Sequence, residues 1–505
     1  MAPSRILILG GGAAGWLSAA YLARSLPDAA ITLVESPAIA TVGVGEGSFP
    51  SLRNTLSFIG LDERAFLRDA DAAFKQGVVF DGWKAAGTSY FHPFNAPHRA
   101  GPVDLAPYWL LRRAAGAATP FADAVTLQGE VVRQGRAPKR LSDPDFAGPM
   151  NYAYHFDAAK LAEALAAHAR TLGVRHLQGE ADGVTLAPDG RIAGVHVAGH
   201  GDLSADLYLD CTGFRARLIG EALGARFRPA GDSLFNDRAV ALQLPYDRPD
   251  APIVPATVAT AHAAGWTWDI GLPSRRGIGY VYSSAHCDDD RAEATLRAYA
   301  GPAADGLSAR RLRFDTGYRE TPWIGNCVAV GLAAGFFEPL ESTGVMLIEI
   351  AAAMIADLFT PDPDGMAAAA RRYNAMMSER HARIIDFLKL HYALSRRPEP
   401  YWRDNADPRS WSETLRDHLA QWARRPVSRF DFAVDHETFL PPSYQFILYG
   451  MDAPVETQAL AARHPHAAAA ERAFDEVRRG APEALRHLPG HRDLLTALTA
   501  GTRAA

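Results

Sequence analysis

The stretch Phe336–Gly344, FFEPLESTG, carries groups that could do chemistry. It leads into an apolar run, Val345–Phe359, that predicts a helix. The backbone N–H groups of Thr343 and Gly344 would then lie at a helix N-terminus, where free donors and the helix dipole favour an anion. Glu341, just before them, is an acid set in apolar surroundings. The stretch therefore predicts an anion site beside a carboxylate.

A second candidate site is the glycine turn in Ile6–Gly15, ILILGGGAAG. Four apolar residues predict a short buried strand, Gly10, Gly12 and Gly15 follow in G-x-G-x-x-G spacing, and a helix is expected from Ala13 to Leu26. In this motif the first glycine permits the turn, the second admits a pyrophosphate and the third allows close helix–strand packing. Glu35 lies 20 residues after Gly15, the expected place for a group that binds a ribose hydroxyl. The pattern predicts a dinucleotide site without separating flavin from nicotinamide.

A third group combines a lysine with aromatic side chains. Lys75 stands in AAFKQGVVF with almost no charged neighbours, and lysine is rarely buried without a purpose or partner. From this stretch alone, a snorkelling surface lysine is the favoured interpretation. The stretch Ser89–Phe94, SYFHPF, could frame a flat aromatic ligand or fill a core. Trp266 and Trp268 share one face of a predicted strand, and their spacing alone favours core packing.

The elements around these residues predict an α/β fold with an FAD-binding, Rossmann-like core of the flavin monooxygenase type. Further strands are expected at Ile31–Val34, Ala205–Gly213 and Cys327–Gly331. Alternating patterns predict a separate antiparallel sheet layer from Ala239–Leu244, Gly265–Leu272 and Gly279–Ser284. Asp157 is a plausible N-cap for a helix over Ala158–Leu172, and residues 115–150 look loop-rich. The expected division is residues 1–350 for the FAD-binding core with its interleaved sheet, and 351–505 for a mainly helical part closing the substrate pocket.

Composition narrows the class of protein. A net charge of −5 over 505 residues implies no nucleic-acid or anionic-membrane partner. The three widely spaced cysteines suggest a reducing compartment without a disulfide framework. There is no metal-ligand spacing, no apolar run long enough for a membrane and no signal peptide before the first strand. We expect a cytoplasmic protein that is a monomer or a homodimer and holds no metal.

Together these motifs resemble the flavin-dependent tryptophan (indole) halogenases. The resemblance rests on GGGAAGW, GVGEGSFP, AFK, YHFDA, DCTGF, GWTWDI with GYVYSS, and GLAAGFFEPLESTG, and it runs from Ile6 to beyond Gly450. It implies that FADH2, supplied by a separate flavin reductase, reacts with oxygen and with chloride or bromide to give hypohalous acid. The acid then passes through an internal tunnel to a lysine beside an indole-type substrate.

The resemblance also implies roles for individual residues. Lys75 and Glu341 match the catalytic pair, in which the lysine holds hypohalous acid by hydrogen bonding or forms a haloamine, and the glutamate polarises the oxidant or accepts the ring proton. An ammonium is a good donor at neutral pH, which favours hydrogen bonding. Thr343 and Gly344 match the halide loop. The residues matching the FAD site are Gly10, Gly12, Ala13, Ala14, Gly15, Glu35, Gly45 and Leu332. Those matching the tunnel and the separation of flavin from substrate are Trp266, Trp268 and Ser342, although Gly271 stands where the family pattern has proline.

On the substrate side, His92, Phe94, Val78 and Phe439 match the walls of the indole pocket. Tryptophan halogenases also carry a Tyr-Tyr pair and a later Glu that hold the carboxylate and ammonium of the amino acid. Between Val427 and Phe439 this chain has FDFAVDHETF instead. Since a site that loses its polar partners loses the discrimination they supply, we expect an indole, a simple derivative or a larger indole-bearing molecule rather than free tryptophan.

Two other functions remain open. A flavin monooxygenase that hydroxylates an aromatic ring would share the nucleotide fold, but it would reduce its own flavin with NAD(P)H and would not need both Lys75 and Glu341. A non-catalytic flavin-binding protein would need neither these residues nor the halide loop.

Overall fold

The computed structural model describes residues 3–38, 45–99, 101, 103–433 and 437–500. Contacts divide the chain into two compact units, each built from three segments. Unit 1 comprises Met1–Ala72, Phe156–Ala230 and Phe314–His381. Unit 2 comprises Ala73–His155, Gly231–Arg313 and Ala382–Ala505. The chain thus passes from one unit to the other several times.

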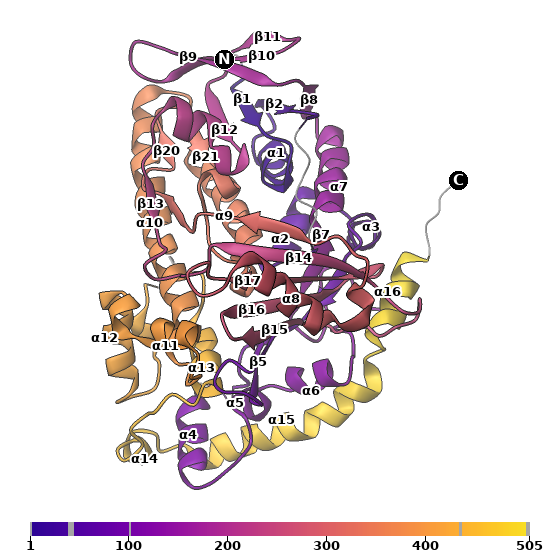
Figure 1. Ribbon diagram of the computed structural model, residues 1–505, viewed down its shortest axis with the longest axis vertical. Helices are drawn as coiled ribbons and strands as arrows, with labels where there is room; N and C mark the ends of the chain where they lie inside the picture. Colours follow the sequence, from indigo (N-terminus) through magenta and orange to yellow (C-terminus); the bar gives the residue numbers. More distant parts are fainter. Residues whose placement is uncertain (1–2, 39–44, 100, 102, 434–436, 501–505) are drawn as a thin grey trace. The chain divides into compact units, whose positions relative to one another are not determined.

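Unit 1 is built on a six-stranded sheet in the order β20-β21-β12-β1-β2-β8 (Figure 1). All neighbours are parallel except β20 and β21, which are antiparallel. The strands are β1 Arg5–Leu9, β2 Ala30–Glu35, β8 Arg175–Gln178, β12 Leu207–Asp210, β20 Trp323–Ile324 and β21 Cys327–Ala329. The central strands read as continuous apolar runs, as expected for parallel strands covered on both faces.

Helix α1, Ala13–Ser25, contacts β1 and β2 of this sheet. It also packs against two further helices of unit 1, α7, Ala158–Thr171, and α9, Thr343–Leu358. The predicted N-cap of α7 is confirmed, because the Asp157 carboxylate accepts hydrogen bonds from the N–H groups of Ala159 (3.0 Å) and Lys160 (3.2 Å).

Smaller elements complete unit 1. They are the helices α2 Ser51–Ile59 and α3 Glu63–Asp69, the strand β3 Gly45–Gly47, the hairpin sheet of β9 Ala181–Leu186, β10 Ile192–Val197 and β11 Gly201–Leu203, and the sheet of β13 Phe227–Pro229, β19 Gly317–Arg319 and β22 Gly335–Phe336. The motif residues before Gly45, 41–44, lie outside the described part.

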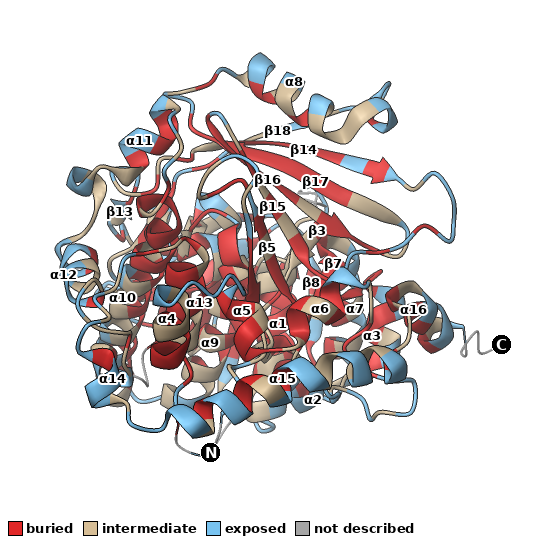
Figure 2. Ribbon diagram, turned by 90° about the horizontal axis from the view of Figure 1, so that it is seen from below, coloured by how far each residue is buried: buried red, intermediate tan, exposed pale blue. Residues whose placement is uncertain are grey.

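Unit 2 contains a seven-stranded sheet in the order β18-β14-β17-β16-β15-β5-β6. Its strands are β5 Gly77–Asp81, β6 Ser89–Pro93, β14 Arg238–Pro245, β15 Thr257–His262, β16 Gly265–Gly271, β17 Arg275–Tyr282 and β18 Arg310–Arg313. The predicted antiparallel layer is confirmed, although β15 and β5 pair in parallel. Figure 2 shows that the middle of this sheet is largely buried. A separate strand, β4 Ala73–Lys75, pairs antiparallel with β7, Ala153–Asp157.

The C-terminal third is mainly helical, as predicted. The long helix α10, Pro363–Ala393, begins in unit 1 and ends in unit 2. The remaining helices of unit 2 are α4 Ala106–Ala114, α5 Phe121–Val125, α6 Gln128–Arg133, α8 Asp289–Ala300, α11 Pro400–Ala406, α12 Glu413–Trp422, α13 Pro441–Gly450, α14 Leu460–Arg463, α15 Ala467–His487 and α16 His491–Thr499.

Residues 115–150 are loop-rich, as expected, and the two short helices within them, α5 and α6, have five and six residues, too few to show a helical period. The compact units differ from the expected division at residue 350, because segments from three parts of the chain build each unit. Within the described residues, no helix combines the length and apolar character needed to cross a membrane.

Candidate active site

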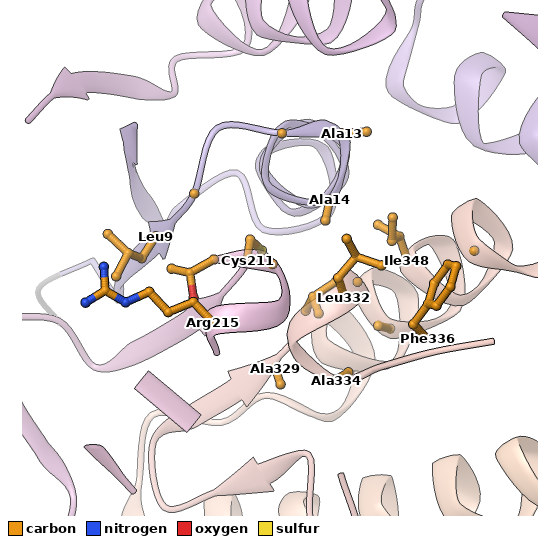
Figure 3. Close-up of a pocket in the computed structure, with 18 of the residues that line it drawn as sticks. Leu9, Ala13, Ala14, Cys211, Arg215, Ala329, Leu332, Ala334, Phe336 and Ile348 are labelled. Atoms are coloured by element: carbon orange, nitrogen blue, oxygen red, sulfur yellow. The ribbon is translucent and has the colours of Figure 1, made fainter. Parts of the chain in front are cut away.

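A cavity of about 510 Å³ lies in unit 1, where the carboxyl ends of β1, β2, β12 and β21 meet. In parallel sheets, ligands bind at this edge of the strands. The predicted site residues that line it are Gly10, Gly12, Ala13, Ala14, Glu35, Leu332, Thr343 and Gly344. Figure 3 shows Ala14, Leu332 and Ile348 on the same side of this space. Gly15, Gly45, Glu341 and Ser342 are not among its lining residues.

The three motif glycines are required for different reasons. Gly10 has a φ of +117°, and a Cβ there would lie 2.3 Å from the carbonyl oxygen of Cys211. A Cβ on Gly15 would lie 1.9 Å from the carbonyl oxygen of Gly10, so only glycine lets α1 start this close to β1. A Cβ on Gly12 would meet no protein atom within 4 Å, although Gly12 lines the cavity. The space beside Gly12 is therefore available to a ligand, as a pyrophosphate would need.

Glu35 ends β2 at the rim of the glycine turn. Its carboxylate lies 3.0 Å from Nε2 of His176, and a Cβ on Gly11 would lie 2.2 Å from the carboxyl carbon. The acid therefore lies against the turn itself. The residues present fit an FAD, with a turn for the pyrophosphate and an acceptor for a ribose hydroxyl.

Several cavity residues were not predicted as site residues. Cys211 and Thr212 follow β12, where the DCTGF motif marked a strand end. The buried Asp210 organises this turn, since its carboxylate accepts hydrogen bonds from the N–H groups of Thr212 (3.1 Å) and Leu218 (2.7 Å). Tyr373 and His381 come from α10, where the sequence gave no signal.

Glu46 is another cavity residue that sequence reasoning missed as a site residue. Burial, with a smaller contribution from the charge of Asp157, raises its pKa to about 7. A carboxyl that titrates near neutral pH can hold or release a proton under working conditions. The glycines on either side of it were the available signal.

The loop before α9 has an unusual backbone. Glu341 and Ser342 both have left-handed conformations, with φ of 64° and 58°. Each such residue costs roughly 1–3 kcal/mol, and strain of this kind is concentrated at functional sites. Helix α9 begins at Thr343, and Thr343 and Gly344 line the same cavity as the glycine turn. A helix N-terminus thus faces the space next to the expected dinucleotide site. Glu341 itself is buried.

Lys75 lies in unit 2 and is fully buried, with 0% of its surface exposed, so the interpretation as a snorkelling surface lysine is wrong. It ends β4, opposite Ala153 of β7. Its ammonium lies over the ring of Phe94, 5.3 Å from the centroid. A buried ammonium against an aromatic face is held by the ring quadrupole and shielded from water.

The aromatic residues predicted as substrate walls also lie in unit 2. Val78 on β5 is directly opposite His92 on β6, and both are buried. Phe439 is stacked on Phe387 of α10, with ring centroids 3.7 Å apart, and His92 lies 6.2 Å from the same Phe387 ring. Phe387 was not predicted, because its helical spacing indicates only a core position. Residues 434–436 of the region without the Tyr-Tyr pair lie outside the described part.

Trp266 and Trp268 both lie in β16 and are buried. The Trp266 ring packs 5.8 Å from Trp83. A Cβ on Gly279 would lie 2.1 Å from the Trp268 ring, so this indole packs directly on the backbone of β17. Both side chains therefore have packing roles in the sheet of unit 2.

Comparisons with known proteins agree with this geometry. Residues 5–466 match the family model described as tryptophan halogenase. Tryptophan 6-halogenase SttH of Streptomyces toxytricini is 36% identical, covering 98% of each chain. Tryptophan 7-halogenase RebH of Lentzea aerocolonigenes is 35% identical, covering 80% of this chain and 79% of its own.

Solved structures of halogenases also resemble this chain in fold and sequence. A tryptophan halogenase from Shewanella frigidimarina superposes with a TM-score of 0.95 at 38% identity, covering 99% of this chain and 98% of its own. BrvH, a flavin-dependent halogenase from Brevundimonas sp. BAL3, gives a TM-score of 0.88 at 33% identity, covering 98% and 99%. The chain belongs to the flavin-dependent tryptophan halogenase family and is an enzyme of that class.

Proposed function

We propose that this enzyme uses FADH2, oxygen and chloride or bromide to halogenate an indole-type substrate other than free tryptophan. The observation that carries the proposal is that one cavity of unit 1 is lined by both the glycine turn and the N-terminus of α9. That cavity combines a dinucleotide site with an anion site. A separate flavin reductase would supply the reduced cofactor, and we expect a cytoplasmic monomer or homodimer.

In unit 1, Gly10 and Gly12 would border the FAD pyrophosphate, Gly15 would let α1 start close to β1, and Glu35 would accept a hydrogen bond from a ribose hydroxyl. Reduced FAD, together with oxygen, supplies the oxidant that converts halide to hypohalous acid. The N–H groups of Thr343 and Gly344 would bind the halide at the start of α9. Because backbone amides select weakly by anion size, bromide is as acceptable as chloride.

In unit 2, the Lys75 ammonium would donate a hydrogen bond to the oxygen of hypohalous acid. This donor makes the halogen more electrophilic, and the buried surroundings strengthen the interaction. The ring carbon forms its bond to halogen as the halogen–oxygen bond breaks, and the departing hydroxide takes up a proton as water. Glu341, which is paired with Lys75 on the family resemblance alone, would accept the proton that leaves the ring carbon. A haloamine on Lys75 would instead require a neutral amine.

The substrate proposal depends on the aromatic residues of unit 2. His92, Val78, Phe94 and Phe439 offer apolar and aromatic surfaces suited to an indole. The stretch before Phe439 lacks the Tyr-Tyr pair that would hold an amino-acid carboxylate. We therefore expect kcat/KM for indole to exceed that for tryptophan.

The test is bromination with a flavin reductase, NADH, FAD, oxygen and bromide, with indole and tryptophan as competing substrates and mass spectrometry as the readout. We expect brominated indole from the wild type and none from Lys75→Ala. Lys139→Ala is the matched control, because Lys139 is also buried in unit 2 but donates to the carbonyl oxygen of Pro144 at 2.7 Å.

Other outcomes would contradict the proposal. Hydroxylated indole without bromide incorporation would identify a monooxygenase. Bound FAD without any bromide-dependent product from either substrate would favour a binding protein. Equal bromination of tryptophan and indole would refute the substrate assignment alone.

A further inference from the structure

The strand that carries Lys75 is fixed by groups from distant parts of unit 2. The N–H of Gln76, which follows the lysine, donates to the carbonyl oxygen of Pro255 at 2.8 Å. The N–H of Phe74, which precedes the lysine, donates to Nε2 of His491 at 3.1 Å. His491 is the first residue of α16 and is separated from Phe74 by 417 positions. A histidine side chain from the end of the described chain therefore supports the backbone next to Lys75.

The protonation state of His491 follows from its two partners. Its Nδ1 lies 3.0 Å from the carbonyl oxygen of Ile253, which can only accept, so Nδ1 carries the hydrogen. Nε2 is then the acceptor for the Phe74 N–H. Burial lowers the pKa of His491 to about 4, which keeps the ring neutral and Nε2 unprotonated. Only 1% of the surface of His491 is exposed.

The start of α16 is itself held in place. The N–H of His491 donates to the carbonyl oxygen of Gly135 at 2.9 Å, and the N–H of Ala137 donates to the carbonyl oxygen of Pro489 at 3.0 Å. Arg492 donates to the carbonyl oxygen of Pro273 at 3.1 Å. Because its backbone is anchored on both sides, His491 is a rigid support rather than a passing contact.

The other face of the strand carries the lysine. Ala73 is opposite His155 in the β4–β7 pair and Lys75 is opposite Ala153, so Lys75 and His155 lie diagonally on one face. Phe74 points to the opposite face, where its ring lies 5.9 Å from that of His491. His491 therefore bonds to the backbone of Phe74, the residue next to Lys75, from the face opposite the lysine side chain.

We propose that His491 is a positioning residue that fixes β4 so that the Lys75 ammonium meets hypohalous acid and substrate in one geometry. This inference rests on the proposed role of Lys75. Catalytic groups must be held within about 0.5 Å of the productive geometry, and a strand of three residues has few bonds of its own to do this. Loss of the Phe74 acceptor would let the lysine move while leaving the cavity residues of unit 1 unchanged.

The test compares His491→Phe, which fills the space without an acceptor, with His491→Gln, whose amide offers one acceptor and one donor. Each variant is assayed with reductase, FAD, NADH, bromide and indole. Brominated indole and hypobromous acid captured by a β-diketone are measured together. We expect His491→Phe to lower kcat for indole at least tenfold with KM within twofold, and to increase captured hypobromous acid. His491→Gln should restore most of the product.

Two controls separate this inference from the proposed function. His286→Phe alters another histidine of unit 2, bonded to Asp404 and away from β4, and should keep the wild-type product ratio. Lys75→Ala should release hypobromous acid and give no brominated indole. If Lys75→Ala does not behave in this way, the proposed function itself is refuted. A wild-type product ratio in His491→Phe, with Lys75→Ala inactive, would refute the positioning role. If His491→Phe does not fold, His491→Asn, which is too short to bridge both partners, must show the same shift from product to captured acid.

Discussion

A buried carboxyl on α9 gives the sharpest quantitative prediction. Glu349 is only 5% exposed and accepts hydrogen bonds from the hydroxyls of Ser51 (3.0 Å) and Thr55 (2.5 Å) on α2. Burial raises its pKa from 4.5 to about 7, although the two hydroxyl donors act in the opposite direction. Because the folded pKa exceeds the unfolded one, the stability associated with this group is complete below pH 4.5 and is lost as pH rises to about 7.

The magnitude follows from that shift. One pKa unit corresponds to about 1.36 kcal/mol, so linkage between pH 5 and pH 8 removes about 2.5 kcal/mol from the free energy of unfolding. Glu349→Gln keeps the shape and an acceptor but does not ionise. The variant should therefore gain about 2.5 kcal/mol relative to the wild type over this range.

The assay is urea unfolding of both proteins at pH 5, 6, 7 and 8. Taking the difference between them cancels the other groups that titrate in both proteins. Glu163→Gln, on the exposed surface of α7, is the control and should show no pH-dependent difference. If the Glu349→Gln and wild-type stabilities stay parallel from pH 5 to 8, the carboxyl is ionised throughout and the burial argument is wrong.

Two further predictions concern unit 1. Gly15→Ala should destabilise the fold and abolish FAD binding, since the added Cβ would lie 1.9 Å from the Gly10 carbonyl oxygen. Gly12→Ala should keep the free energy of unfolding within about 1 kcal/mol of the wild-type value and lose only FAD affinity. Thermal unfolding with flavin fluorescence titration distinguishes them, and equal loss of stability in both would contradict the distinction. Asp157→Ala should cost about 1 kcal/mol by removing the cap of α7 and should lower the pKa of Glu46, because the charge of Asp157 contributes to raising it. Urea unfolding and NMR titration of the Glu46 carboxyl check this, and an unchanged pKa would show that burial alone raises it.

The glycine turn could be predicted because its constraints are local. Positive φ at Gly10 and the close approach of Gly15 to Gly10 depend on residues within one turn of chain. The same holds for the Asp157 cap of α7 and for the helix that begins at Thr343. In each case a short spacing determines the geometry, so residue types alone suffice.

The environment of Lys75 could not be read from its own stretch. Its burial depends on Phe94 and on the opposing strand at Ala153, and the support from His491 comes from much further along the chain. Phe387 is a similar case, because a helix position that packs on Phe439 has the same pattern as any core position. The family resemblance, rather than local pattern, was what made Lys75 a candidate catalytic residue.

The bond between Phe74 and His491 also has a consequence for biosynthesis. At about 5–20 residues per second, a ribosome delivers His491 roughly 20–80 seconds after Phe74. All three segments of unit 1 are synthesised by residue 381, whereas unit 2 waits for the last helices. The lysine strand therefore gains its hydrogen bond from Phe74 to His491 only after the first residue of α16 has been synthesised. During synthesis, the three segments of unit 1 are therefore available to fold before the strand that carries Lys75 has all its bonds, and chaperone dependence should be greatest in that interval.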